Sequence, residues 1–372
     1  MKIRSVPFFN YPWVYEQHEE EIKSVMQDVL KRGAFILQKD LEEFENSISK
    51  FIDAKYVLGV ADGTNALNLG LISAGIGRGD EVILPSHTYI ASAASIHYVG
   101  ATPVPVECGE DHMLDVDSIK KAITKHTKAI MPVQLNGRTC NMHKIQAIAD
   151  EADLLIIEDA AQALGSKFKG KSAGTFGVVG TFSFYPAKVL GCFGDGGAVV
   201  TNDNTIGDKL ALLRDHGRNA KGDVVAWGTN SRLDNLQAAV LSVKLKYYIH
   251  DINRRRELAA LYDSYLKEIR QLRLPPPPSN DCEHFDVYQN YELVADQRDE
   301  LKSYLAEHGV GTLIQFGGKA IHQHTELGFR DIRLPVTERM YERFLMLPMN
   351  TSLTNSDVEY VCEKLCNFYK NK

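Results

Sequence analysis

Short apolar segments recur along the chain from about residue 56, and stretches of helical composition separate them. The segments are VLGV, EVILP, TPVPVE, AIMPVQ, LLIIED, GTFSFY and GAVVTN, and they fall between residues 57 and 202. Alternation of this kind is typical of a largely parallel β-sheet covered by helices. The pattern therefore predicts an α/β fold.

Helical periodicity predicts helices before and after this region in the sequence. Between Tyr15 and Gly33 the apolar residues repeat every three to four positions, and Gly33 is a natural helix end. A long helical segment runs from Asp234 to about Ile269 and leads to the rigid stretch Pro275–Pro278, which suits a connector.

A smaller region of mixed structure follows the prolines. We expect a strand over 291–294 and helices over 297–308 and 358–369. A chain of 372 residues exceeds the usual size of a single domain. We therefore expect a large domain over residues 1–245 and a small domain over 246–372.

Composition excludes several classes of protein. The hydrophobic share of 44% and the charged share of 24% are those of a globular protein. A net charge of -6 argues against a nucleic-acid partner, because phosphate binding needs a clustered basic excess. Without a signal-peptide pattern or an apolar run long enough to span a bilayer, we expect no membrane association and a cytoplasmic location.

The cysteines show neither the paired spacing of a zinc site nor that of a disulfide framework, so they are interpreted as free thiols in a reducing compartment. They are Cys108, Cys140, Cys192, Cys282, Cys362 and Cys366. His322 and His324 lack a third ligand in the sequence around them. We therefore expect no metal site.

Polar residues cluster directly after several of the predicted strands. They occupy positions 62–64, 86–89, 159–162 and 183–188. Because chemistry in such folds gathers at the carboxyl ends of the strands, these segments are expected to contribute to one site.

Lys188 follows a predicted strand and a turn at Pro186, and it precedes a glycine-rich loop. Burial would lower the pKa of its amine and favour the neutral nucleophile that Schiff-base formation requires. By itself the position is equally compatible with a surface lysine or a helix cap.

Asp159 ends a wholly apolar predicted strand, so its carboxylate needs a partner. A protonated pyridine nitrogen would serve, with an attraction of roughly 4 kcal/mol at about 4 Å before desolvation. The alternative is an aspartate that caps a helix beginning at Ala160.

Gly63 and Thr64 stand where a strand passes into a helix, and the N–H groups of a helix N-terminus bind phosphate. A simple N-capped helix is the alternative. The glycines at 191–197 precede a strand and lack the order of a nucleotide-binding P-loop.

Taken in order, the motifs resemble the sugar aminotransferases of the DegT/StrS type, which have the aspartate-aminotransferase-like fold (fold type I). The resemblance runs through GTNAL, PSHTYIAS, EDAAQALGS, FSFYPAK, GDGGAVVTN, LRDHGR, GTNSRLDNLQAAVL, LPVTER and LMLPMNTSLT. It implies a mostly parallel seven-stranded sheet, a smaller α+β C-terminal domain, pyridoxal 5'-phosphate as cofactor and a homodimer with shared active sites.

The resemblance also implies roles for single residues. Lys188 would form the internal aldimine and move the proton, and Asp159 would pair with the pyridinium nitrogen. The other expected cofactor residues are Gln162 near the ring hydroxyl, Tyr89 stacked on the ring, Gly63, Thr64 and Ser183 at the phosphate, and Asn230 reaching the phosphate from the partner subunit.

Two segments depart from the family pattern. QLNGRTCNM stands where many relatives have histidine or tyrosine before the glycine, and IQFGGKAIHQH replaces a common tyrosine-proline pattern. Arg138, Lys319 and His322 lie in these segments and are predicted to contact the substrate, where the two cations would favour an anionic group.

The predicted reaction transfers an amino group from L-glutamate to a keto-sugar and makes an amino sugar for surface polysaccharide or lipopolysaccharide. The acceptor is expected to be a nucleotide-linked keto-deoxyhexose or a free acidic keto-sugar such as 8-keto-3-deoxy-octulosonate. Two alternatives are a keto-sugar dehydratase of the same fold, whose relatives have histidine in place of Lys188, and a non-catalytic regulatory relative, which loss of Lys188 or Asp159 would have signalled.

Overall fold

Seven strands form the central sheet of the computed structural model, which describes residues 4–279 and 283–370. Their order is β1-β9-β8-β5-β4-β2-β3, and only β9 is antiparallel to its neighbours. The strands are β1 (Tyr56–Val60), β2 (Glu81–Pro85), β3 (Thr102–Val106), β4 (Thr127–Ile130), β5 (Leu155–Asp159), β8 (Val179–Ser183) and β9 (Gly197–Thr201). Each predicted apolar segment supplies one strand, so the prediction of a mostly parallel seven-stranded sheet is confirmed.

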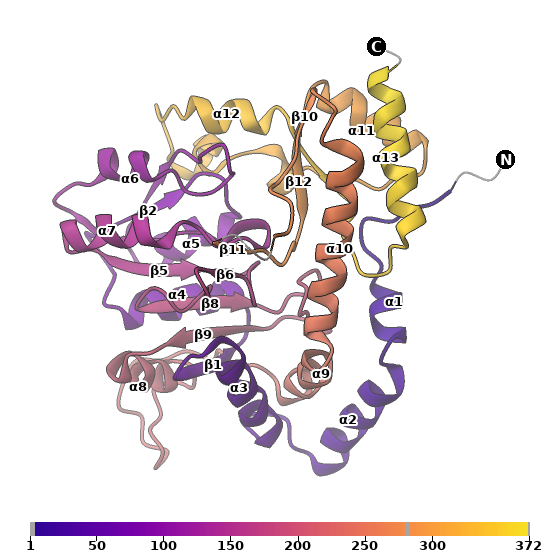
Figure 1. Cartoon of the computed structure of the whole chain (residues 1–372). Coiled ribbons are helices and arrows are strands. Elements are labelled where there is room, and N and C mark those ends of the chain that lie inside the picture. Colours follow the sequence, from indigo (N-terminus) through magenta and orange to yellow (C-terminus); the bar gives the residue numbers. More distant parts are fainter. Residues whose placement is uncertain (1–3, 280–282, 371–372) are drawn as a thin grey trace.

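Helices cover both faces of this sheet (Figure 1). One face packs on α4 (Gly63–Ser73), α5 (Ile90–Tyr98) and α8 (Asn204–Leu213), and the other on α3 (Lys39–Ile52), α6 (Val116–Ala122) and α7 (Met142–Ala152). The neighbours Ile156 and Ile157 of β5 belong to cores on opposite faces. This explains the continuous apolar runs, because a strand covered on both sides has no solvent face.

The edge strand β3 carries Pro103 and Pro105 and pairs with β2 alone. Proline has no N–H to offer a further strand, so it suits an edge and discourages pairing with another chain.

The N-terminal helical segment forms α1 (Tyr11–Glu16) and α2 (Glu19–Arg32). Helix α2 ends at Gly33, whose φ of 62° is left-handed, as the predicted stop requires. The apolar stripe of α2 buries Ile22 and Val29.

The long helix expected from Asp234 to Ile269 is two helices, α9 (Asn235–Leu245) and α10 (Tyr248–Leu266). The break at Lys246 and Tyr247 lets α9 pack on α2 and α3 while α10 packs on α13 (Asn355–Lys370). Periodicity did not reveal the break, because it carries neither proline nor glycine.

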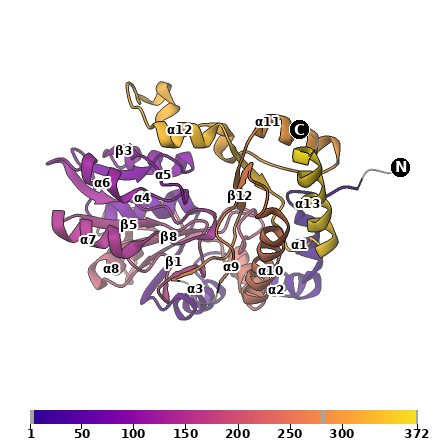
Figure 2. The ribbon, with the colours of Figure 1, turned by 45° about the horizontal axis from the view of Figure 1, so that its top comes forward.

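A second sheet follows, of β10 (Leu272–Arg273), β12 (Tyr291–Ala295) and β13 (Phe344–Leu347), in the order β10-β12-β13. Together with α10, α11 (Arg298–Glu307) and α13 it encloses a separate core that also includes Val6 (Figure 2). Thus a residue near the N-terminus packs with the C-terminal part of the chain, and the division at residue 245 stays a prediction.

Short elements complete the fold. The strands β6 (Lys167–Phe168), β7 (Lys171–Ser172) and β11 (His284–Phe285) form a third sheet, and α12 (Pro335–Tyr341) precedes β13. The one-turn 3-10 helices are η1 (Leu135–Gly137), η2 (Gln315–Gly318), η3 (Ile321–Gln323) and η4 (Thr325–Leu327). Among the described residues, no helix is both long and apolar enough to cross a membrane.

Gly180 in β8 is predicted to tolerate no side chain. A Cβ there would lie 2.0 Å from the carbonyl oxygen of Gly174, which is backbone and cannot move cheaply. We expect Gly180→Ala to lower the free energy of unfolding by about 3 kcal/mol or more. Gly77→Ala is the control, since its Cβ would meet only the Val99 oxygen at 3.7 Å. Urea midpoints of the two variants that agree within error would contradict this account of β8.

Candidate active site

A cavity of about 650 Å³ opens at the carboxyl ends of β1, β2, β5 and β8. Its lining includes seven of the predicted cofactor residues, namely Gly63, Thr64, Tyr89, Asp159, Gln162, Ser183 and Lys188. It also includes Asp62, Thr88 and Tyr185 from the expected segments, and Asn65, Asp195 and Phe316, which lie outside those segments and were not predicted. The strand-end segments therefore meet in one place, as expected.

Helix α4 directs its N-terminus at this cavity. Asp62 is the N-cap and accepts a hydrogen bond from the Asn65 N–H at 2.8 Å. A Cβ at Gly63 would lie 2.8 Å from the Ser183 Cβ, so glycine is needed for β8 to approach the first turn. The result is a helix N-terminus beside a hydroxyl, which is a suitable cradle for a phosphate.

Asp159 ends β5 and is only 6% exposed. One carboxylate oxygen accepts a hydrogen bond from the Ser92 hydroxyl at 2.7 Å, and the other accepts one from the Ala161 N–H at 3.2 Å. No helix begins at Ala160, where the chain instead forms turns, so the helix-cap alternative is wrong. Ser92 lies in the PSHTYIAS segment, but its contact with Asp159 could not be found from sequence.

Lys188 lies in the turn after β8, and its own N–H donates to the Tyr185 carbonyl at 2.8 Å. Burial lowers the pKa of its amine to about 8, although the charge of Asp159 acts in the opposite direction. Gln289 fixes the backbone on both sides: it accepts from the Val189 N–H at 2.9 Å and donates to the Ala187 carbonyl at 2.8 Å. A desolvated amine facing a cavity does not fit the surface-lysine alternative.

Gln162 is bound by Asn136, which lies in the segment QLNGRTCNM that departs from the family pattern. Its side-chain oxygen accepts a hydrogen bond from the Asn136 N–H at 2.8 Å and one from the Asn290 side chain at 3.4 Å. Asn136 has a left-handed φ of 56°, a conformation that asparagine tolerates better than most residues.

The three predicted substrate residues lie outside the lining of this cavity. Arg138 is paired with Asp286. Burial raises the pKa of Asp286, and the positive charge of Arg138 opposes part of this rise. His322 is 4% exposed and bonds Ser86 at 2.7 Å and Glu338 at 3.2 Å, while Lys319 is exposed.

Asn230 is exposed in the segment that follows α8 and extends away from the sheet in Figure 1. It forms an isolated bridge with Asp215. The same segment exposes Val224, Val225 and Trp227, and Trp227 is 98% exposed. Within one chain, Asn230 is not part of the cavity lining.

With this geometry in view, the comparisons with known proteins assign the class. The sequence model of the DegT/DnrJ/EryC1/StrS aminotransferase family matches residues 16–366. The chain belongs to this family of pyridoxal-phosphate-dependent enzymes, which confirms the resemblance drawn from the motifs.

Among its relatives is dTDP-3-amino-3,4,6-trideoxy-alpha-D-glucose transaminase of Streptomyces venezuelae, 43% identical over 84% of this chain and 82% of the relative. A Geobacillus stearothermophilus relative named pleiotropic regulatory protein is 37% identical over 99% of both chains. The crystal structure of S. venezuelae DesV in complex with a ketimine intermediate superimposes with a TM-score of 0.93, at 38% identity and 98% coverage of both chains. The chain is thus an aminotransferase with the expected fold.

The residues present fit the family's cofactor. An amine of lowered pKa, a buried carboxylate and a helix N-terminus face one cavity. They suit, in that order, the aldehyde, the ring nitrogen and the phosphate of pyridoxal phosphate.

Uptake of pyridoxal phosphate by the cofactor-free protein is predicted to depend on the proton of Lys188. Because the pKa is lowered to about 8, the amine is charged below this pH and neutral above it. The initial rate of uptake, followed by visible absorbance, should rise as pH increases through about 8 and then level off. A rate that keeps rising toward the pKa of an ordinary lysine would contradict the desolvation of Lys188.

Proposed function

We propose that this chain transfers an amino group from L-glutamate to a nucleotide-linked keto-sugar, with Lys188 and Asp159 holding pyridoxal phosphate. One observation carries the proposal: Asp159 ends β5, Lys188 follows the adjacent strand β8, and both face the same cavity, which the N-terminus of α4 also borders. The cofactor, when bound, supplies an electron sink for the amino-bearing carbon.

The protein residues would then divide the work. Lys188 would hold the cofactor. Once the donor amine has displaced it, its Nζ would take the proton from the substrate carbon and deliver it to the cofactor carbon. Asp159 would keep the ring nitrogen protonated, and the hydroxyl of Ser92 orients the carboxylate for that task. Gly63, Thr64 and Ser183 would bind the phosphate, Tyr89 would stack on the ring and Gln162 would contact the ring hydroxyl.

A nucleotide-linked acceptor is supported by the relative from S. venezuelae, whose name specifies a dTDP-sugar. Arg138 would suit a free acidic sugar such as 8-keto-3-deoxy-octulosonate, but its charge already faces Asp286. The product would be an amino sugar for surface polysaccharide or lipopolysaccharide. The described cysteines are free thiols, which agrees with a cytoplasmic enzyme.

We further propose a homodimer in which Asn230 completes the partner's phosphate site. The segment that carries Asn230 exposes Val224, Val225 and Trp227, and the cavity rim exposes Tyr89 and Tyr185. Large exposed apolar side chains on both parts are typical of surfaces that another chain covers.

A non-catalytic regulatory role is the second candidate, because the Geobacillus relative is named a regulatory protein. The presence of both Lys188 and Asp159 at the cavity favours catalysis. Lys188 also argues against the dehydratase alternative.

A panel of acceptors tests the proposal directly. The cofactor-loaded protein is incubated with L-glutamate and, in turn, with dTDP-, UDP- and GDP-linked 3- and 4-keto-hexoses and with 8-keto-3-deoxy-octulosonate, and 2-oxoglutarate is measured. We expect turnover with a nucleotide-linked sugar and none with Lys188→Ala, which should still bind cofactor through the phosphate contacts. Turnover only with the free sugar would reverse the choice of acceptor, and none with any sugar would favour the regulatory role.

Replacement of Asp159 by asparagine is predicted to lower kcat on the order of 100-fold or more, because a neutral amide cannot keep the ring nitrogen protonated. Asp153→Asn is the matched control. Asp153 lies just before the other end of β5, is exposed and has a left-handed φ of 52° that asparagine also accepts. Equal kcat values for the two variants would show that Asp159 has no role at the ring.

A further inference from the structure

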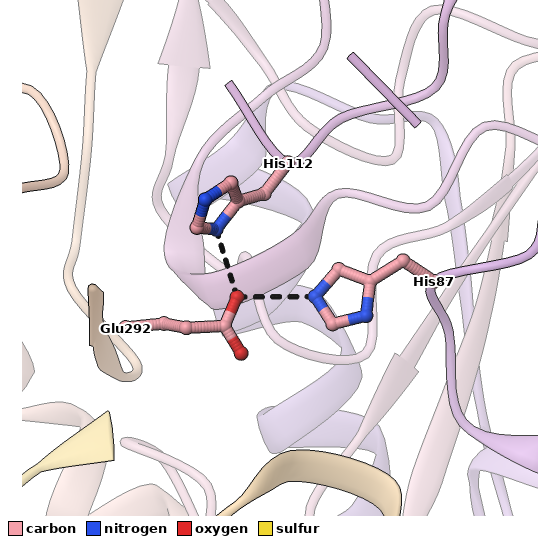
Figure 3. Close-up of side chains that lie close together, drawn as sticks. All are labelled: His87, His112 and Glu292. Atoms are coloured by element: carbon pink, nitrogen blue, oxygen red, sulfur yellow. Dashed lines mark hydrogen bonds and ion pairs between the residues drawn. The ribbon is translucent and has the colours of Figure 1, made fainter. Parts of the chain in front are cut away.

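Two histidines and a glutamate form a cluster in which His87 and Glu292 are buried and His112 is partly buried (Figure 3). His87 follows β2, His112 lies in the loop after β3 and Glu292 lies on β12. The Glu292 Oε1 is 3.0 Å from the His87 Nε2 and 2.9 Å from the His112 Nδ1. One possible ligand atom from each residue lies within 4.8 Å of the others.

The carboxylate of Glu292 is bonded unequally. Its Oε1 is the partner of both imidazoles and also accepts a hydrogen bond from the Asn136 side chain at 3.0 Å. Its Oε2 is buried and has no hydrogen-bond partner among the described residues, although Glu292 is only 1% exposed. A buried carboxylate oxygen without a partner is costly, and a bound cation would remove that cost.

The groups around the cluster are those that orient metal ligands. The His87 Nδ1 is 2.9 Å from the Tyr341 hydroxyl, and a metal-bound imidazole commonly uses its second nitrogen in this way. His112 adopts a left-handed φ of 68°, a conformation that costs energy and is common at functional sites.

We propose that His87, His112 and Glu292 bind one divalent transition-metal ion, for which Zn²⁺ is the best match. Two imidazoles and a carboxylate are a recurrent zinc ligand set, with water in the fourth position. Metal bonds of about 2.0–2.2 Å place neighbouring ligand atoms about 3.3 Å apart. The two contacts of the Glu292 Oε1 therefore need only a small expansion, and all three ligand atoms already lie within 4.8 Å of one another. A cavity of about 50 Å³, lined by His112, Asn136 and Glu292 among others, gives access.

Binding requires a rearrangement of protons but no redox chemistry. His87 would bind through Nε2 with its hydrogen on Nδ1, where it donates to Tyr341, and His112 would bind through Nδ1 with its hydrogen on Nε2. Any second proton on either ring would pass to solvent.

The ion would connect the large sheet with β12 directly behind the cavity. Asn136, which bonds Glu292, also donates its N–H to Gln162, and Phe316 of the cavity wall packs 5.6 Å from the His87 ring. The metal would therefore stabilise this wall, and its contribution is structural. The sequence prediction of no metal site considered His322 and His324, which are not part of this cluster.

The test measures metal bound to the cofactor-loaded protein. After dialysis against a chelator and then against buffer, Zn²⁺ is titrated by calorimetry and bound zinc is counted by elemental analysis. We expect one zinc ion per chain and a higher Tm with zinc. Glu292→Gln and His112→Ala should weaken zinc binding roughly 10- to 100-fold or more.

His322→Ala is the matched control, because His322 is also buried and paired with a carboxylate but, among the described residues, belongs to no group of three potential metal ligands. It should keep the zinc. X-ray absorption of the wild-type protein adds a measurement that no folding defect can disturb, and should show nitrogen and oxygen ligands at about 2.0–2.1 Å. Less than one zinc per chain, sulfur ligands, or unchanged affinity in Glu292→Gln would overturn the proposal. None of these readouts depends on transamination.

Discussion

The site depends on one constraint: an amine and a carboxylate must remain buried together at the end of the sheet. Adjacent strands supply them, because β5 pairs in parallel with β8 and Asp159 stands opposite Thr181. Lys188 then returns to the cavity through the turn after β8. Desolvation disfavours the charged form of the lysine, while two hydrogen bonds hold the carboxylate of Asp159 in place.

Successive side chains of β5 point to opposite faces of the sheet, so its acidic neighbours Glu158 and Asp159 have different surroundings. Asp159 faces the cavity, whereas Glu158 points to the other side and accepts hydrogen bonds from the N–H groups of Gly174, Phe176 and Gly177 and from Gln134. Burial raises the pKa of Glu158, and those four donors oppose the rise. A carboxylate so surrounded secures the turn that precedes β8. The strand that carries the cavity carboxylate thus also anchors the neighbouring strand.

Most of the sheet followed from local patterns, and the core of the site followed from those patterns together with the family resemblance. The seven apolar segments, the polar residues after them and the lysine behind Pro186 are close in sequence to the structures they form. Contacts between distant segments could not be predicted in this way. Gln289 bonds the backbone beside Lys188 from about 100 residues away in the sequence, and Arg138 meets Asp286 across 148 residues. For Arg138 the loop and its departure from the family pattern were visible, but the neutralising partner was not.

Asn136 connects the loop that carries Arg138 to the cavity wall, although Arg138 itself faces Asp286. Its N–H contacts Gln162 in the cavity wall, its side-chain oxygen accepts from Asn290, and its side-chain nitrogen donates to Glu292. An aromatic side chain at this position would offer no amide to make the last two bonds together. The segment that departs from the family pattern therefore bonds, through Asn136, the buried carboxylate of Glu292 on β12. In this chain the second sheet contributes directly to the wall of the cavity, so the geometry around Gln162 is set jointly by both parts of the molecule.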